Sequence, residues 1–510
     1  MKRYHFILKL VVAIGSYGLS RPSLFFVNGL PQPLNYLAPF LELFSLSLFI
    51  SLILNCVNWK QRILSSFTYV FSCQSIVYYA GILFTIQRLL PSKPLYQHLI
   101  NIFLIGYNHF HLIIWGTLLI PWAFQKISRW LLISLVIVVW EYWLPTILII
   151  PTGQTWIEFA PHLGLASIFG FPIYGMLQYA LAGTVHTRNG FKIVCVTLTI
   201  FILCNLNFNP GVETSKKIAF THMDLEPRGV LAQQKDGEFM RRAYLNELKK
   251  GMPQNWEADL WFAPESSWPI LIKTAQEEED VKNFIFSGTT PQTVTAMGIT
   301  RLIKRTDYLH VKNSFLFFDM EGGKSYYDKI KLMPFSETNF LGFKDEFIAD
   351  ILGKKDFNIA GDSYPIFKTR SGVNFISTIC SEVSHLGIIR EYLNQVAEQP
   401  FFIMNGANDK WFTPSNIPQL HFIMNRWMAA SFEMPVARAT IGGISGFINF
   451  DGTVSTSLQS TQTQLIISSL RVKQNTPSGK NIYTRFGLWP ICLLILSLVT
   501  FLLIKERRND

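Results

Sequence analysis

The chain has 510 residues, of which 49% are hydrophobic and only 15% are charged. This composition is too apolar for an ordinary soluble enzyme and indicates a membrane protein. The net charge of +11 would also fit a nucleic-acid-binding protein. However, many of the lysines and arginines stand in short loops between apolar segments, where membrane topology explains them, so no nucleic-acid partner is expected. The sequence has no Walker A loop, no H-E-x-x-H motif and no zinc-type Cys/His spacing, so it predicts neither a metal site nor a cofactor.

Residues 1–209 are a succession of apolar runs, each close to the ~20 residues that an α-helix needs to cross a bilayer. Another apolar run lies near the end of the chain. Together they predict about eight transmembrane helices, at 5–22, 35–56, 63–88, 97–122, 129–150, 165–185, 191–208 and 486–504. The first run resembles a signal peptide, but other runs follow it at once, so we expect an uncleaved anchor.

Positive charges are distributed unequally between the two sets of loops. Lysine or arginine precedes the first run and follows the second, fourth, sixth and last runs, whereas the other loops carry fewer. By the positive-inside rule, both termini are cytoplasmic and the long segment before the last run lies outside the cytoplasm. We therefore expect a membrane domain of about seven helices over 1–209, an outer domain over 210–485, and a final helix with a short cytoplasmic tail over 486–510.

Glu141 stands inside one of these apolar runs, where a charged group is costly. It could line a path for a substrate, or it could form a hydrogen bond between two helices. The sequence leaves both interpretations open.

The outer part alternates short apolar runs with amphipathic segments, a pattern typical of one layered α/β domain. Strands are predicted at 217–223, 259–263, 283–288, 314–318, 375–380 and 400–405. Helices are predicted at 235–250, 385–396 and 417–433, and a closing hairpin over 443–450 with a turn at Asp451-Gly452.

Cys380 is the only one of the six cysteines in this outer part. Because it has no partner for an internal disulfide, it is either a small buried hydrophobe or a nucleophile. It follows a predicted strand and leads into a predicted helix, where a nucleophile is commonly exposed. A Cys-His pair with His385 is not expected, because that helix would carry the imidazole away from the thiol.

Two other stretches carry charged groups that suit a cysteine nucleophile. Glu265 follows a predicted strand, where a carboxylate with a raised pKa can act as a general base, although an ordinary surface glutamate is the common alternative. Lys329 precedes Glu337 in a segment that could place both side chains in one pocket. An ammonium there would stabilise an oxyanion and favour a thiolate. Lys331 competes for this role, and a solvated charge run is the alternative.

Three motifs occur in an order that resembles the Glu-Lys-Cys triad of the nitrilase (carbon–nitrogen hydrolase) superfamily. They are Pro264-Glu265, Tyr327-Asp328-Lys329 and Ile379-Cys380-Ser381-Glu382. With the predicted spans, further segments are similar to the apolipoprotein N-acyltransferase family, the bacterial membrane branch of this superfamily. These segments are K-L-M-P-F-S-E at 331–337, N-D-K-W-F at 408–412, His421-Phe422 with Met424 and Arg426, and Y-T-R-F-G-L-W-P at 483–490. The resemblance implies a nitrilase-like αββα domain in the periplasm, attached to a multi-pass helical domain in the inner membrane.

The resemblance also implies an acyltransferase that works without a cofactor. Cys380 would be the nucleophile, Glu265 the general base and Lys329 the electrostatic stabiliser, with Glu337 and Glu382 as supporting carboxylates that orient the lysine and the substrate amine. Cys380 would take an acyl chain from a membrane phospholipid as a thioester. The chain would then pass to the α-amino group of the N-terminal diacylglyceryl-cysteine of an apolipoprotein. The enzyme is expected to be a monomer.

An apolar arm follows the second of these motifs. Its large side chains include Phe340, Phe343, Phe347 and Ile348. We expect the arm to dip into the bilayer and gate the entry of lipid. Packing of the same side chains on the domain core is the alternative.

The sequence departs from the family pattern near the nucleophile and in the long helix. Ser381 stands where the family usually has Tyr, and Met428, Ser431 and Met434 stand where it has Arg, Glu and Arg. These departures concern the substrate more than the chemistry. They leave open a different acyl donor or acceptor, or a divergent paralogue. A membrane-tethered amidase, which would share the triad and use water in place of the amine, is the second hypothesis. A catalytically inactive scaffold is a third, and the retained triad argues against it.

Overall fold

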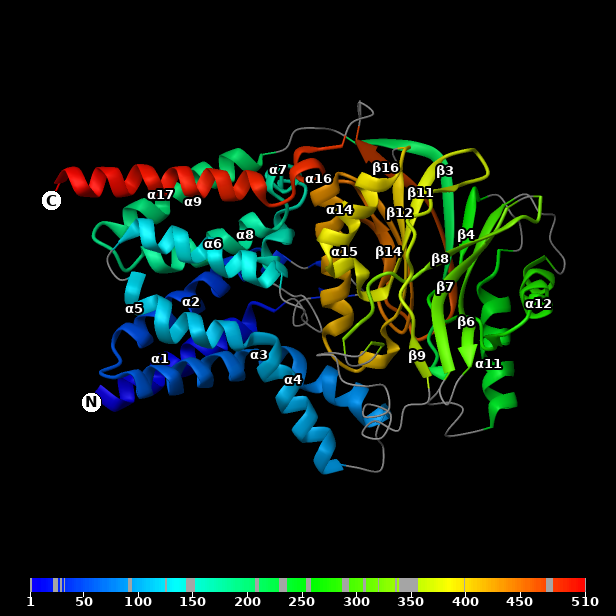
Figure 1. Cartoon of the computed structure of the whole chain (residues 1–510), viewed down its shortest axis with the longest axis horizontal. Coiled ribbons are helices and arrows are strands. Elements are labelled where there is room, and N and C mark those ends of the chain that lie inside the picture. Colours follow the sequence, from blue (N-terminus) through cyan, green and yellow to red (C-terminus); the bar gives the residue numbers. More distant parts are fainter. Residues whose placement is uncertain are drawn as a thin grey trace.

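A computed structural model describes residues 2–21, 26–27, 30–31, 33–89, 94–123, 126–143, 152–206, 211–228, 236–253, 258–286, 293–305, 309–319, 321–334, 337–338, 356–398, 400–473 and 480–509. Helices formed by the apolar runs make up one half of the molecule (Figure 1). Two β-sheets with their covering helices make up the other half. The last helix returns to the first half, so the chain begins and ends among the apolar helices.

Each predicted span contains a helix. The helices are α1 (Lys2–Leu19), α2 (Ala38–Leu54), α3 (Trp59–Leu89), α4 (Pro94–Ile114), α5 (Ile120–Ala123), α6 (Ile127–Trp143), α7 (Ala166–Phe169), α8 (Pro172–Thr184), α9 (Gly190–Asn205) and α17 (Trp489–Asn509). The span predicted over 165–185 is not one helix. It is divided into α7 and α8, because Gly170 between them adopts a φ of 69°, which no α-helix continues through.

Two of these helices are long and apolar enough to cross a membrane, over Asn35–Leu54 and Trp59–Arg88. A third candidate is bent by 56° between Leu95–Tyr107 and Phe110–Ala123. Three others, over Tyr4–Leu19, Gly190–Asn205 and Trp489–Lys505, are apolar but shorter. The described part of the chain therefore supports a membrane-spanning helical domain, and the count of about eight spans stays a prediction.

The other half contains two mixed β-sheets. One has the strand order β10-β11-β12-β13-β14-β15, with bounds Phe367–Lys368, Asn374–Ile379, Phe402–Asn408, Val436–Ile441, Ser445–Ile448 and Val454–Leu458. The other has the order β16-β3-β4-β6-β7-β8, with bounds Gln464–Lys473, Gly211–His222, Leu260–Phe262, Val294–Arg305, Leu309–Phe318 and Lys324–Asp328. β5 (Leu271–Ile272) pairs with β6, and β9 (Asp356–Asn358) pairs with β7. The central strands of each sheet are parallel and the outer pairs are antiparallel.

The two sheets pack face to face through aromatic side chains. The ring centroids of Phe220 and Phe447 are 4.8 Å apart, and those of Phe317 and Phe375 are 5.9 Å apart. Helices α11 (Gly237–Gly251) and α12 (Ala275–Phe286) cover one outer face, and α14 (Leu386–Gln395) and α15 (Ile417–Phe432) cover the other (Figure 1). This order of layers is the expected αββα arrangement.

One strand prediction is wrong. Residues 283–286 lie in α12, and 287–288 are outside the described residues. The buried members of this helix are Val281 and Ile285, which are one helical turn apart and so face the same side. A short apolar run has no period of its own that distinguishes a strand from a buried helix segment, and the acidic turn before it belongs to the same helix.

The layer formed by α14 and α15 lies against the apolar helices. Arg426 of α15 lies 3.2 Å from the Glu158 carboxylate in the short helix η4 (Gln154–Phe159), and it also donates to the carbonyl of Ile157. The neighbouring Trp427 donates its indole N–H to the carbonyl of Gln154. Arg426 and Glu158 are both buried, so this ion pair joins the two halves in a place that excludes water.

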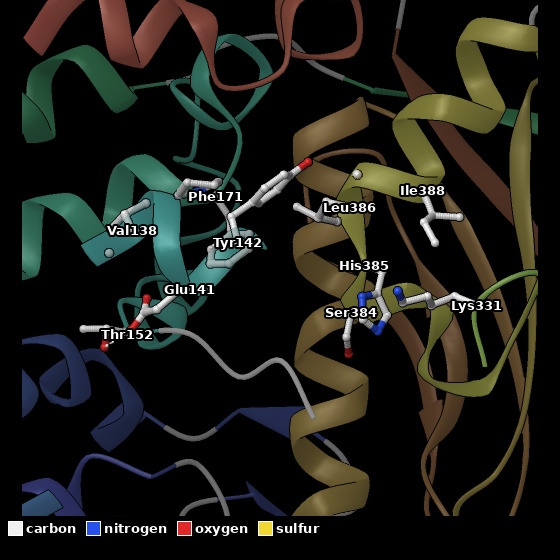
Figure 2. Close-up of a pocket in the computed structure, with 13 residues that line it drawn as sticks. Val138, Glu141, Tyr142, Thr152, Phe171, Lys331, Ser384, His385, Leu386 and Ile388 are labelled. Atoms are coloured by element: carbon white, nitrogen blue, oxygen red, sulfur yellow. Dashed lines mark hydrogen bonds between the residues drawn. The ribbon is translucent and has the colours of Figure 1, made fainter. Parts of the chain in front are cut away.

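A cavity of about 170 Å³ lies at the same boundary (Figure 2). Its walls come from α6 and the start of α8 on one side, and from the turn that leads into α14 on the other. Glu141 of α6 lines the cavity and also accepts a hydrogen bond of 2.7 Å from the Tyr179 hydroxyl of α8. Both of the roles that the sequence left open for Glu141 are therefore compatible with its position.

The interface predicts a loss of stability when one partner of its ion pair is removed. Arg426→Met leaves the Glu158 carboxylate buried without a counter-ion, which typically costs on the order of 3–5 kcal/mol. We expect a clear fall in the Tm of the detergent-solubilised protein. The matched double variant Glu158→Gln/Arg426→Met removes both charges and should recover much of the loss. Unchanged melting of Arg426→Met would contradict this account of how the two halves are joined.

Candidate active site

Glu265 is held at the end of β4 by close backbone contacts. A Cβ on Gly298 of β6 would stand 2.0 Å from the carbonyl oxygen of Pro264, and one on Gly406 of β12 would stand 3.2 Å from the Glu265 amide nitrogen. Glycine is therefore required at 298 for this approach, and at 406 a side chain would crowd the same segment. The Glu265 carboxylate accepts 2.6 Å and 2.8 Å hydrogen bonds from the Asn313 side chain and the Asn408 amide. These two donors fix its orientation between the sheets.

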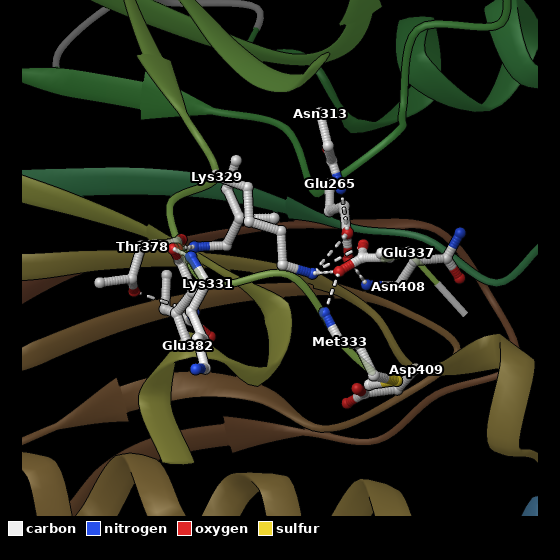
Figure 3. Close-up of polar contacts among 12 residues, drawn as sticks. Glu265, Asn313, Lys329, Lys331, Met333, Glu337, Thr378, Glu382, Asn408 and Asp409 are labelled. Atoms are coloured by element: carbon white, nitrogen blue, oxygen red, sulfur yellow. Dashed lines mark hydrogen bonds and ion pairs between the residues drawn. The ribbon is translucent and has the colours of Figure 1, made fainter. Parts of the chain in front are cut away.

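Lys329 follows β8 and is buried beside two carboxylates. Its Nζ lies 2.8 Å from the Glu337 carboxylate and 3.9 Å from Glu265 Oε1 (Figure 3). Glu337 also accepts a 2.8 Å hydrogen bond from the Met333 amide, which holds the carboxylate in place. Burial alone would lower the pKa of Lys329, but Glu337, Cys380 and Glu265 raise it above its ordinary value. The side chain is therefore a fixed ammonium group.

Cys380 stands at the sharp turn between β11 and the short 3-10 helix η5 (Cys380–Ser384). Its φ is 54°, a left-handed conformation that costs a non-glycine residue about 1–2 kcal/mol. The side chain is only 6% exposed. Burial raises the pKa of the Cys380 thiol well above its ordinary value, Glu265 raises it further, and Lys329 opposes both. The resting thiol is therefore protonated, and a nearby base must remove its proton before it can attack.

Glu382 is fully buried and connects the segment of Lys329 with the turn of Cys380. It accepts four hydrogen bonds, from the amides of Ile330, Lys331 and Ile379 and from the Tyr327 hydroxyl. Burial raises the pKa of Glu382, and these donors partly offset that effect. Glu382 binds the backbone next to Lys329 and not the ammonium group. Each of its two carboxylate oxygens already accepts two hydrogen bonds. Glu382 thus orients the lysine segment, and the role predicted for Glu337 and Glu382 toward a substrate amine stays a prediction.

The structure brings Glu265, Lys329, Glu337 and Cys380 into one cluster. The hydroxyl of the adjacent Ser381 is buried and has no hydrogen-bond partner among the described residues. The expected gating arm, with Phe340, Phe343, Phe347 and Ile348, lies outside the described residues.

The other candidate side chains point elsewhere. Lys331 and His385 line the cavity at the boundary with the apolar helices, so Lys329 is the lysine of the cluster. The expectation against a Cys-His pair stays a prediction. Over the part of the chain that the structure describes, no group of three or more histidine, cysteine or carboxylate side chains is placed to hold a metal ion.

Sequence reasoning missed the residues that orient Glu265. Asn313 lies inside β7, among the buried residues of that strand, and a polar side chain in such a place is the signal that could have singled it out. Asn408 belongs to the N-D-K-W-F motif, but it binds Glu265 through its backbone amide, and no sequence pattern predicts such a contact. Asp409, next in the chain, binds His421 and Arg438 and adds negative charge near Cys380.

The cluster lies directly against two of the apolar helices. Met333, in the segment that joins Lys329 to Glu337, shares one hydrophobic cluster with side chains of α3 and α4. This hydrophobic cluster also contains Phe412, Ile417 and Leu420 of the catalytic half. On the polar side, Arg88 of α3 donates a 2.7 Å hydrogen bond to the carbonyl of Trp411. The reactive groups are therefore placed at the boundary with the helices that could span a membrane.

The family model for carbon-nitrogen hydrolases matches residues 242–476, which include all the residues of this cluster. This part of the chain is a carbon-nitrogen hydrolase domain. The strand β3 precedes the matched residues and completes one of the two sheets of the domain.

Curated proteins similar to the chain carry the name apolipoprotein N-acyltransferase. The protein of Haemophilus ducreyi is 28% identical over 185 residues, which cover 36% of this chain and 35% of the relative. That of Bradyrhizobium diazoefficiens is 27% identical over 332 residues, covering 61% and 58%. That of Wigglesworthia glossinidia brevipalpis is 24% identical over 379 residues, covering 69% and 70%. The first two alignments thus span less than two thirds of the relatives' length, and the third extends beyond the carbon-nitrogen hydrolase domain.

The electrostatics of the cluster predict opposite effects of two substitutions on thiol reactivity. Because the Cys380 pKa is raised, its alkylation by iodoacetamide should still increase about tenfold per pH unit well above neutral pH. Glu265→Gln removes a charge that raises this pKa and should accelerate alkylation at a given pH. Lys329→Met removes the charge that lowers it and should slow alkylation.

The measurement is peptide mapping by mass spectrometry over a pH series, with Cys380→Ala to identify labelling of the other cysteines. A rate that levels off near neutral pH, or the same direction of change in both variants, would contradict the charge balance described for Cys380.

Proposed function

We propose that the protein is an apolipoprotein N-acyltransferase of a bacterial inner membrane. It would transfer an acyl chain from a membrane phospholipid, through a thioester on Cys380, to the α-amino group of the N-terminal diacylglyceryl-cysteine of a lipoprotein. The names of the similar proteins and the carbon-nitrogen hydrolase domain support this proposal. The observation that carries it is that the segment joining Lys329 to Glu337 packs against the apolar helices α3 and α4. A site in that position suits substrates that stay anchored in a bilayer.

In the first half-reaction, Glu265 removes the proton of the Cys380 thiol as its Sγ attacks the ester carbonyl carbon of the phospholipid. The carbonyl oxygen becomes an oxyanion, which the Lys329 ammonium stabilises. The intermediate then collapses, the bond between the carbonyl carbon and the glycerol oxygen breaks, and Glu265 returns the proton to that oxygen. A lysophospholipid leaves, and the acyl chain remains on Cys380 as a thioester.

In the second half-reaction, the α-amino group of the acceptor attacks the thioester carbonyl. Glu265 accepts a proton from the amine, and Lys329 again stabilises the oxyanion. The C–S bond breaks and the proton goes to the departing sulfur, which regenerates the thiol and releases an amide. Each half-reaction needs a protonated Lys329 and an ionised Glu265 at its start. The ion pair with Glu337 would keep Lys329 charged, and the two hydrogen bonds would hold the Glu265 carboxylate in position.

The proposal includes an arrangement of the chain in the membrane. Residues 1–209 would form a domain of about seven transmembrane helices, residues 210–485 a periplasmic catalytic domain, and residues 486–510 a final helix with a cytoplasmic tail. The termini would both be cytoplasmic and the enzyme would act as a monomer. The arm that contains Phe340 and Phe347 would gate the entry of lipid from the bilayer.

A membrane-tethered amidase would use the same three residues but would admit water to the acyl-enzyme. The contact of the site with the apolar helices favours a lipid donor, and the names of the relatives favour an amine acceptor. No observation on this chain favours the amidase.

The thioester is the feature to test. We expect the intact mass of the purified protein in phospholipid micelles to increase by one fatty-acyl group. Cys380→Ala should show no increment, because the nucleophile is absent. Glu265→Gln should form the acyl-enzyme about 10²–10⁴-fold more slowly, the usual contribution of a general base.

Cys204, a cysteine in α9 and outside the cluster, provides the matched control, and Cys204→Ala should acylate as the unchanged protein does. An increment that persists in Cys380→Ala would contradict the assignment of the nucleophile. A folded, unchanged protein that gains no acyl group from phospholipid would contradict the proposed donor.

A further inference from the structure

The cavity between the two halves is polar on one side and separate from the cluster around Cys380. Its volume of about 170 Å³ is more than ten times the roughly 10–15 Å³ that one water molecule requires. The wall contributed by the catalytic half consists of Lys331 and the consecutive residues 384–388 (Figure 2). This wall starts where η5 ends, so the same short helix carries Cys380 at its first residue and a cavity residue at its last.

Three side chains on this wall have polar atoms without a partner. Lys331, His385 and Ser384 form no side-chain hydrogen bond or ion pair with any described residue. Ser384 is a buried residue, only 4% exposed, and it lines the cavity. In Figure 2 the Lys331 ammonium points toward the His385 ring, and both lie at the same end of the cavity. A lysine without an acceptor beside the hydroxyl of a buried serine leaves hydrogen-bond donors available to a ligand in the cavity.

The start of α14 adds backbone donors to the same wall. Leu386 and Gly387 are the first residues of this ten-residue helix and line the cavity. Their N–H groups precede the first intrahelical hydrogen bond, and His385 provides no side-chain cap. The positive end of the helix dipole therefore points toward Lys331, a combination that favours an anion.

The opposite wall, on the membrane side, offers no comparable set of free donors. Its charged group is Glu141, which accepts hydrogen bonds from the hydroxyls of Tyr179 and Thr152 at 2.7 Å and 3.3 Å. Val138, Phe171 and Pro172 add apolar surface to this wall, and Tyr142 adds a phenol ring. Burial and the charges of Lys331 and Lys329 lower the pKa of His385 to about 3, so its ring is neutral and can donate one N–H. Among the described residues that line the cavity, Lys331 is the one lysine or arginine.

We infer that this cavity binds a phosphate group through Lys331, Ser384, His385 and the N-terminus of α14. This inference rests on the proposed function, in which the phosphodiester of the phospholipid donor supplies that group. Lys331 follows Lys329 closely in the chain. The Glu382 carboxylate accepts hydrogen bonds from the backbone amides of both Lys331 and Ile379, and Ile379 directly precedes Cys380. A phosphate held there would place the neighbouring glycerol ester toward the thiol, while the acyl chains contact the apolar helices.

The test uses the Cys380→Ala protein, which cannot form the thioester, so its outcome does not depend on acyl transfer. Native mass spectrometry from detergent measures the Kd of dioctanoyl phosphatidylglycerol with and without Lys331→Gln. We expect Lys331→Gln to raise this Kd about 10–100-fold, the usual effect of losing a hydrogen-bonded charge. Lys331→Arg should largely restore binding, because the charge is kept. Ser384→Ala removes one neutral donor and should weaken binding only a few-fold.

Two controls separate the phosphate from the acyl chains. Dioctanoylglycerol has the same chains without phosphate, and its binding should not change with Lys331→Gln. Lys368→Gln removes an exposed lysine of β10, which pairs with Glu398, and should leave phosphatidylglycerol binding unchanged. An equal Kd with and without Lys331→Gln would overturn the inference. An equal loss for both lipids would overturn it as well, because it would mean that the variant perturbs the fold.

Inorganic phosphate distinguishes the two sources of the ligand. If the cavity holds the lipid phosphate, inorganic phosphate should displace phosphatidylglycerol from the protein with Lys331 and have no effect on Lys331→Gln. Phosphate that binds in a Lys331-dependent way without displacing the lipid would identify a site for the free anion and overturn the assignment to the donor.

Discussion

The buried carboxylate of Glu382 determines how the two reactive segments lie relative to each other. It accepts hydrogen bonds from the amides of Ile330 and Lys331 on one side and from that of Ile379 on the other. Lys329 directly precedes Ile330, and Cys380 directly follows Ile379. The Glu382 carboxylate therefore holds the segment of the ammonium group next to the segment of the thiol. A network of this kind stabilises a single geometry because every donor in it would otherwise be buried without a partner.

The second constraint is the contact between the catalytic half and the apolar helices. Met333 places the segment after Lys329 in one hydrophobic cluster with α3 and α4, and the ion pair of Arg426 with Glu158 fixes α15 on the same side. The cluster at Cys380 and the cavity at Lys331 consequently both lie near the boundary between the two halves. A site at that boundary lies close to the apolar helices, as the proposed transfer between bilayer-anchored substrates requires.

Much of the layered domain could be predicted from sequence, because its strands and long helices carry clear periodicities and the triad motifs occur at strand ends. The failures have physical causes. The run at 283–286 has too few residues to separate a strand from a helix, and Gly170 breaks a run that hydropathy alone joins. Asn313 and Asn408 reach Glu265 only through the pairing of distant strands. The direction of Lys331, away from the thiol and into a cavity, likewise depends on contacts that no local pattern encodes.

The most direct test of the account is to give the purified enzyme a phospholipid and a synthetic diacylglyceryl-cysteine peptide together, and to identify the products by mass spectrometry. The account predicts that the peptide gains one acyl group as an amide, in equal amount to the lysophospholipid released, and that Cys380→Ala gives neither product. Release of free fatty acid with an unmodified peptide would contradict it, because water and not the amine would then be the acceptor.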